Sequence, residues 1–494
     1  MSPTDPSQDN EPYAPPQAAG RLPEPKLVGA GRAPAGVPDV LRFAWPTILS
    51  FVAGNLFRVN DQYWVQYLGQ DAQAALGAVT FLMVMNFAAY FLTLSGSMSL
   101  VSQRTGSGDI AGRDQAIRGA LMLGAGIAFL VGAIGWTIAP WALTRMGLEG
   151  DIHTYALQYT RMIYIAALPI ALAPLVDSFF VSMGDTRTPF LLQLGAVALN
   201  FCLNPMLIYE GAPWDVDLGS PERMGMTGAA LATGLSRLLV LSLGLIILAR
   251  RYKVRWMPRR EPRIATMALL ARTGIPSSAS IGVYAGVYLV MLAFVFDQLD
   301  PSVLAALGIG FNAFEGISFP FYLGVAVAGS SLVGRNLGAG ALDEARRAVR
   351  SVRRVGIGLG ALLALAFLLL GPIVAHKFSQ DPEVVRQTIL YAQVLAASQI
   401  FVAIEAVSEK TLLGAGNTRP IIWITGPGNL LRAPLAWGLA IHFGWGAIGV
   451  WWAINVTTML KALALLTIVE RGGWRGPGGR VAGTKGDGRA RVIG

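Results

Sequence analysis

The sequence predicts an all-α membrane protein in which twelve transmembrane helices form two similar six-helix lobes. Three observations lead to this fold class: an apolar composition, long apolar segments along most of the chain, and an internal repeat. Of the 494 residues, 53% are hydrophobic and only 14% are charged, which is not the composition of a soluble surface. Most of the chain is therefore expected to be solvated by lipid.

Twelve segments are long and apolar enough to cross a membrane. A hydrocarbon layer of about 30 Å requires roughly 20 mainly apolar helical residues, because every backbone amide must be satisfied without water. The predicted spans are 37–68, 74–100, 120–143, 154–181, 189–209, 227–249, 274–296, 303–332, 356–376, 385–413, 420–443 and 447–469.

The regions outside the spans define the remaining organisation. Residues 1–36 are rich in Pro and Gly and are expected to be a disordered cytoplasmic tail rather than a signal peptide. Residues 37–249 form the predicted N-lobe and residues 271–470 the C-lobe. A basic cytoplasmic linker, 250–270, joins them, and a basic cytoplasmic tail, 471–494, follows.

Lys and Arg residues set the expected orientation. Bases gather after the sixth span and after the eighth, whereas alternate loops are poor in bases. Because basic loops stay on the cytoplasmic side, both termini are predicted to be cytoplasmic, in a bacterial-type inner membrane. The bases after the eighth span are Arg335, Arg346, Arg347, Arg350, Arg353 and Arg354.

Several functional classes are disfavoured. The net charge of +10 lies in membrane-flanking loops without interleaved aromatic residues, so a nucleic-acid partner is not expected. The single cysteine, Cys202, and three scattered histidines suggest neither a disulfide nor a metal site. No Walker motif occurs, and the membrane interior lacks His and a nucleophile paired with a base, which disfavours an enzyme.

The two lobes arise from an internal repeat. Gly184-Asp185-Thr186-Arg187 returns as Gly416-Asn417-Thr418-Arg419, 232 residues later. Residues 74–77 return as 305–308, and Asn200 and Pro205 return as Asn429 and Pro434 with the same spacing. Each lobe holds six spans, so the lobes share one orientation and are related by an axis along the membrane normal. Gly184 and Gly416 are expected to adopt positive φ in the short turns.

Six motifs in order resemble the multidrug and toxic compound extrusion (MATE) family, from about residue 37 to 469. They are Asn60-Asp61 with 67–69, the turn 184–189, Asn200-x-x-x-Asn204-Pro205, 228–233, 335–340 and Arg432-x-Pro434. The resemblance implies a two-lobed exporter that exchanges H⁺ or Na⁺ for small, often cationic and amphipathic compounds. No cofactor beyond that coupling ion is expected, and we expect a monomer.

The DinF-like branch, which the chain resembles more, implies an ion-coupling site in the N-lobe. The matching positions here are Asp61, Asn200, Asn204 and Thr233, and Asn204 replaces an acid that the family usually has. Arg58 lies three residues before Asp61, on the same helical face. Two interpretations therefore remain open, a cation site at Asp61 or an ion pair with Arg58.

Further charges fall inside predicted spans, where a charge costs about 2.5–3.5 kcal/mol on insertion scales. Asp177 and Glu409 occupy matching repeat positions, as cytoplasmic gates or in local pairs such as Glu409 with Lys410. The remaining substrate or gating candidates are Glu315, Glu405, Arg58 and Arg432. The acids could also pair with Arg237, Arg432 or Lys461, and a second branch of the family implies acids in the C-lobe.

The leading hypothesis is therefore ion-coupled antiport of drugs by alternating access. The alternative is a flippase for lipid-linked oligosaccharide precursors, a related group with the same broad fold. In that case the intramembrane bases Arg58, Arg237, Arg432 and Lys461 would meet a pyrophosphate.

Overall fold

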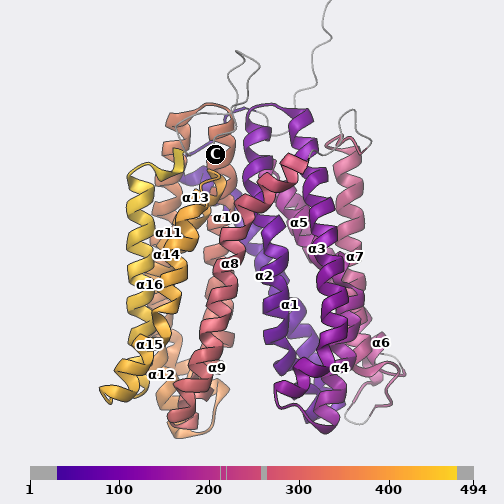
Figure 1. Ribbon diagram of the computed structural model, residues 1–494. Coiled ribbons are helices and arrows are strands. Elements are labelled where there is room, and N and C mark those ends of the chain that lie inside the picture. The colour runs from indigo at the N-terminus through magenta and orange to yellow at the C-terminus, as the bar shows by residue number, and fades with distance from the viewer. Residues whose placement is uncertain (1–30, 212, 218–219, 257–263, 476–494) are drawn as a thin grey trace, which may run out of the picture.

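The protein is a two-lobed bundle of long helices in a computed structural model that describes residues 31–211, 213–217, 220–256 and 264–475. Figure 1 shows the N-terminal half, in indigo to magenta, beside the C-terminal half, in orange to yellow. No strand occurs in the described part of the chain. The predicted tails lie largely outside the described residues, as do residues 257–263 of the predicted linker.

The N-lobe contains seven helices that make six spans. They are α1 (Val37–Val65), α2 (Gln70–Gly106), α3 (Ile110–Arg145), α4 (Gly150–Ile165), α5 (Ala167–Ser182), α6 (Arg187–Ile208) and α7 (Gly225–Arg250). Helices α4 and α5 meet at a bend of 58° and together form the fourth span. Pro169 explains the break, because it has no N–H to offer the carbonyl of Ile165, where α4 ends.

The C-lobe repeats this order with more interruptions. Its α-helices are α8 (Ile264–Phe294), α9 (Pro301–Ile309), α10 (Gly316–Gly338), α11 (Leu342–Phe378), α12 (Pro382–Ala396), α13 (Gln399–Gly414), α14 (Arg419–Leu430), α15 (Arg432–Trp437) and α16 (Ala447–Glu470). Two π-helical turns, Gly310–Glu315 and Gly438–His442, continue α9 and α15. Helices α12 and α13 meet at 54°.

Within the described residues, nine helical segments pass a length and hydropathy test for a membrane span, and the two bent pairs raise the number to eleven. The twelfth is the broken helix from α14 to the second π-helical turn. Its break lies at Leu431, where Pro434 cannot donate to the carbonyl of Leu430. The prediction of twelve spans in an all-α fold is confirmed.

The predicted spans were too short at the ends where basic residues gather. Helix α11 begins at Leu342 rather than 356, so Arg346, Arg347, Arg350, Arg353 and Arg354 lie on its first turns and not in a loop. Charged residues lower the local hydropathy, although the helix continues through them into the interface. Gly184 and Gly416 do have positive φ, of 91° and 75°, as predicted.

The lobes are held together where α2 meets α8 and where α1 meets α10. Helices α2 and α10 cross at the end of the bundle where α1 begins. Their backbones approach so closely there that no side chain fits between them. A Cβ on Gly106 would lie 1.9 Å from the Arg335 carbonyl oxygen, and one on Gly338 would lie 1.8 Å from that of Gln103. The internal repeat makes these two contacts equivalent, because Gln103 and Gly106 lie 232 residues before Arg335 and Gly338.

The crossing is closed further by the segment before α1. The backbone N–H of Ala33 donates to Oδ1 of Asn336 on α10 over 2.8 Å, and that of Gly31 donates to the carbonyl of Gly106. Figure 1 shows the ribbons of the two lobes together at one end of the bundle and diverging toward the other end. The lobes are thus closed against each other at the end where α1 begins and α16 ends.

Candidate functional site

The candidate site centres on Asp61, which lies on the last turns of α1 with only 4% of its surface exposed. Three neutral groups donate to its carboxylate. Nδ2 of Asn204 lies 2.8 Å from Oδ1, and the hydroxyls of Tyr159 and Thr233 lie 3.2 and 3.1 Å from Oδ2. Helices α1, α4, α6 and α7 thus all contribute to one site inside the N-lobe.

A relay of side-chain amides leads into the same carboxylate. Nδ2 of Asn60 donates to Oδ1 of Asn200 over 2.7 Å, and Nδ2 of Asn200 donates to the Thr233 hydroxyl over 3.3 Å. The Thr233 hydroxyl then donates to Asp61. Because each donor in the relay points toward Asp61, the dipoles reinforce one another and favour a negative charge there.

Two acceptor atoms beside Asp61 have no donor. Oδ1 of Asn60 and Oδ1 of Asn204 are buried, and neither has a hydrogen-bond partner in the described structure. A buried polar atom without a partner costs roughly 1–3 kcal/mol and requires an explanation such as an absent ion or water. Carboxylate, amide and hydroxyl oxygens are the donor types that a hard cation takes.

Arg58 does not neutralise Asp61. Its side chain is exposed, and no ion pair joins the two residues in the described part of the chain. The guanidinium instead lies against α10, where a Cβ on Gly316 would be 3.5 Å from an Arg58 nitrogen. Residues three apart share a helical face, but here the long Arg58 side chain extends toward the other lobe. The structure therefore does not contain the alternative ion pair.

A second polar cluster of the N-lobe contains Asp177. Its Oδ2 accepts from Nε2 of Gln193 at 2.6 Å, and Oε1 of Gln193 accepts from Arg237 at 3.0 Å. Arg237 also stacks 4.2 Å above the Phe57 ring centroid. Gln193 therefore links the charges of Asp177 and Arg237, and Asp177 is not part of the Asp61 site.

The C-lobe candidates share no hydrogen bond or ion pair with one another among the described residues, although Arg432 acts electrostatically on Glu405 and Glu315. Glu405 pairs with Lys461 at 2.7 Å and Glu409 with Lys410 at 3.0 Å. Glu315, at the end of the first π-helical turn, accepts from the Tyr391 hydroxyl at 2.9 Å. Arg432 is buried and donates to the hydroxyls of Thr457, Thr458 and Tyr288.

Two contributors to the Asp61 site were not among the residues predicted for it. Tyr159 comes from α4, and no spacing within α4 distinguishes a tyrosine that meets an acid from one at the membrane interface. Asn60 was noted only as the neighbour of Asp61 in a motif. Two features of the sequence could have indicated that Asn60 belongs to the site: it is the residue before Asp61, and its side chain is an amide.

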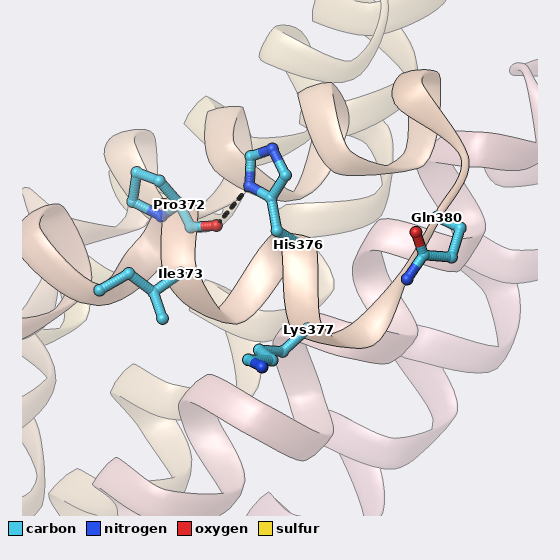
Figure 2. Close-up of a pocket in the computed structure, with 5 residues that line it drawn as sticks. All are labelled: Pro372, Ile373, His376, Lys377 and Gln380. Carbon is cyan, nitrogen blue, oxygen red and sulfur yellow. Dashed lines mark hydrogen bonds between the residues drawn. The ribbon is translucent and has the colours of Figure 1, made fainter.

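A surface recess lies elsewhere, on the end of α11. Figure 2 shows its lining by Pro372, Ile373, His376, Lys377 and Gln380, with His376 Nδ1 lying 2.8 Å from the Pro372 carbonyl. Most of these side chains are exposed, and none belongs to the polar clusters described above. No group of three or more metal-ligating side chains occurs among the described residues.

Comparison with known proteins decides the family. The MatE family matches residues 46–206 and 276–437, once in each lobe. The chain belongs to the MATE family. It is therefore a membrane transporter and not an enzyme, and the two matches fall on the two halves of the internal repeat.

Relatives and solved structures agree with this membership. The chain is 30% identical over 455 residues to a probable multidrug resistance protein NorM of Pseudomonas aeruginosa, covering 87% of this chain and 88% of that protein. A NorM of Thermotoga maritima is 23% identical, with 88% and 92% covered.

Solved MATE structures share the fold. A crystal structure of MATE in complex with MaL6 has a TM-score of 0.80 at 20% identity, covering 89% and 97% of the two chains. A MOP superfamily transporter from Pyrococcus furiosus has a TM-score of 0.77 at 19% identity, covering 89% and 96%. At these identities the likeness supports the two-lobed MATE fold alone, and assignment to the DinF-like branch stays a prediction.

Proposed function

We propose that this MATE transporter is a secondary active multidrug exporter, in which Asp61 binds the coupling cation, H⁺ or Na⁺, and small amphipathic, mainly cationic compounds leave in exchange. The observation that carries the proposal is the Asp61 carboxylate itself. It is buried, it accepts from three neutral donors, and it forms no direct ion pair among the described residues, although Arg237 acts on it from a longer distance. The buried amide oxygens of Asn60 and Asn204 have no donor.

The physical argument rests on the cost of a buried charge. An ionised carboxylate out of water costs far more than the three hydrogen bonds return, unless a proton or a cation neutralises it. Burial alone favours the proton, whereas the donors favour the charged form and so keep release possible. The site therefore has the properties needed to take up a cation and to give it back.

Cation binding can drive transport only through a difference between two conformations. The lobes are closed at the Gly106 and Gly338 crossing, so a second state must open there. A cation that binds one state more tightly than the other shifts their equilibrium by its differential affinity. One charge crossing 100 mV supplies about 2.3 kcal/mol, which is roughly a fiftyfold concentration ratio.

The names of the relatives support drugs as substrates. The NorM proteins of Pseudomonas aeruginosa and Thermotoga maritima and a PmpM are all described as multidrug resistance proteins. The flippase alternative requires bases that are free to meet a pyrophosphate. Of the four intramembrane bases, Lys461 pairs with Glu405, Arg237 bonds Gln193, and Arg432 is held by three hydroxyls. Only Arg58 of the four is exposed, and one base is weaker support for pyrophosphate binding than four.

We expect the protein in a bacterial-type inner membrane with both termini cytoplasmic, and a monomer should suffice because one lobe completes the Asp61 site. The test uses everted vesicles and a cationic dye, with Na⁺ and pH gradients imposed separately. Wild-type protein should move dye into the everted vesicles under one gradient, Asp61→Asn should not, and the exposed control Asp71→Asn should behave as wild type. Unchanged coupled efflux by a folded Asp61→Asn protein would exclude the proposal.

A further inference from the structure

Lys461 of α16 is buried inside the C-lobe, and its ammonium group donates to oxygen atoms of two neighbouring side chains. The side chain is 5% exposed. Its Nζ donates to Oε1 of Glu405 on α13 over 2.7 Å and to Oδ1 of Asn429 on α14 over 2.9 Å. The ammonium is therefore bound by a carboxylate and an amide oxygen from two other helices.

The surrounding chain leaves space for a lysine. A Cβ on Gly428 would lie 2.4 Å from Cγ and 2.7 Å from Cδ of Lys461, so any other residue at 428 would displace the aliphatic part of the side chain. The next residue, Asn429, then supplies the amide oxygen. Gly428 thus makes room for the aliphatic part of the Lys461 side chain, and Asn429 binds its ammonium group.

The repeat relates this position to the site in the other lobe. Asn429 precedes Pro434 as Asn200 precedes Pro205, and Asn200 belongs to the Asp61 site. Helices α14 and α16 have the places in the C-lobe that α6 and α7 have in the N-lobe, and α7 carries Thr233. Met291, near the repeat position of Asp61, is fully buried and apolar, so the acid comes from α13 instead.

Lys461 supplies the one direct ion pair of Glu405 among the described residues. Besides Glu405, the charged groups that act on Lys461 are Glu409 of the same helix as Glu405 and Arg432 of α15. Glu409 is paired with Lys410, and Arg432 acts on Glu405 only without a direct ion pair. Removing the Lys461 ammonium would therefore leave the mostly buried Glu405 carboxylate without a paired cation, which is unfavourable.

We propose that the C-lobe carries a second monovalent-cation site, with Glu405 and Asn429 as its ligands, which the chain's own Lys461 ammonium fills. This proposal rests on the proposed function, because it takes Asp61 to be the site that exchanges cations with the solution. Its consequence is that a small ammonium ion binds at Glu405 and Asn429 once the lysine side chain is shortened.

The experiment measures thermal unfolding in detergent with methylammonium as the probe. The Asp61→Asn background removes any contribution of the N-lobe site, so the result does not depend on whether Asp61 binds a cation. In that background, Lys461→Ala should show a saturable rise in melting temperature with methylammonium chloride, because a ligand that binds only the folded state stabilises it. The background with Lys461 intact should show none.

Two controls define the site. Adding Glu405→Gln to the Lys461→Ala protein should abolish the rise, because the anionic ligand is gone. Tetramethylammonium chloride, whose cation is larger than methylammonium and has no N–H donors, should not substitute for methylammonium. Equal responses of the Lys461→Ala protein with and without Glu405→Gln would overturn the proposal.

A second variant covers a failure of Lys461→Ala to fold. Lys461→Met keeps the aliphatic contact with Gly428 and leaves a gap only where the ammonium lay. Adding Glu405→Gln to it removes the buried charge and should give stable protein. If this double variant folds and Lys461→Met is recovered neither by methylammonium nor by Na⁺, the assignment of a cation site is wrong.

Discussion

Asn204 donates a hydrogen bond from Nδ2 to Oδ1 of Asp61 over 2.8 Å, while its own Oδ1 is buried without a donor. The amide therefore both supports the charge of Asp61 and presents an oxygen beside it. An acid at position 204, which the family usually has, would supply oxygens but no such donor.

Asn204→Asp should make the site hold one more proton near neutral pH than wild type. Two carboxylates at this separation cannot both ionise, so one keeps its proton. A difference acid–base titration of the two purified proteins measures the extra proton. Identical titration curves between about pH 5 and pH 8 would show that the two side chains do not share a site.

Tyr159→Phe should make Asp61 hold a coupling proton more tightly. The lost hydroxyl bond supports the charged carboxylate, and a hydrogen bond to a charged group contributes about 1.5–3 kcal/mol. The proton concentration that half-saturates efflux driven by a pH gradient should therefore fall by roughly tenfold or more. Tyr155→Phe, which alters an exposed bond to Glu222 at the end of the same helix, is the matched control and should leave that midpoint unchanged.

Gly106→Ala should push the lobes apart at their crossing. The added methyl would lie 1.9 Å from the Arg335 carbonyl, and overpacking of this kind costs roughly 1–3 kcal/mol. Distances between spin labels on α3 and α11 should shift toward the state open on this side. Gly77→Ala on the same helix meets nothing within 4 Å and should not move them.

Asp185 should contribute stability that acid removes. It lies in the turn between α5 and α6, outside the spans. Burial opposes its ionisation, but bonds from Thr188 and Tyr252 and the charge of Arg251 outweigh it, so the pKa of Asp185 lies below its ordinary 3.8. A lowered pKa in the folded state gives stability that is present above the unfolded value and lost as pH falls through the folded one.

The melting temperature of wild type should therefore exceed that of Asp185→Asn by a constant amount from neutral pH to about pH 4. Below that, the difference should shrink. The exposed Asp215 gives the control, because Asp215→Asn should melt as wild type at every pH. A difference that stays constant to pH 2 would refute the role of the Asp185 charge.

The twelve spans and the two lobes could be predicted because hydropathy and the repeat are properties of whole segments. The bends could not be predicted from the same information. Pro169 and Pro434 indicate two of the breaks, whereas the bend after Ala396 has no proline nearby and depends on packing. Hydropathy also missed the first turns of α11, because the arginines there lower the average hydropathy of the segment.

The Asp61 site, too, could be predicted from the sequence only in part. The resemblance placed Asp61, Asn200, Asn204 and Thr233 in one group, and the structure brings these four together. Tyr159 and the direction of the Arg58 side chain depend on how α4 and α10 pack against α1, which no local spacing specifies. In the C-lobe, the pairing of Glu405 with Lys461 rather than with Arg432 likewise required the three-dimensional arrangement.

The central claim is that Asp61 is the site of the coupling cation. Its most direct test is the number of protons or Na⁺ ions that purified protein binds in the absence of drug, for wild type, Asp61→Asn and the control Asp71→Asn. We predict that one saturable cation-binding event of wild type and of Asp71→Asn is missing from Asp61→Asn. Equal binding by folded Asp61→Asn would contradict the claim and would move the coupling site elsewhere in the chain.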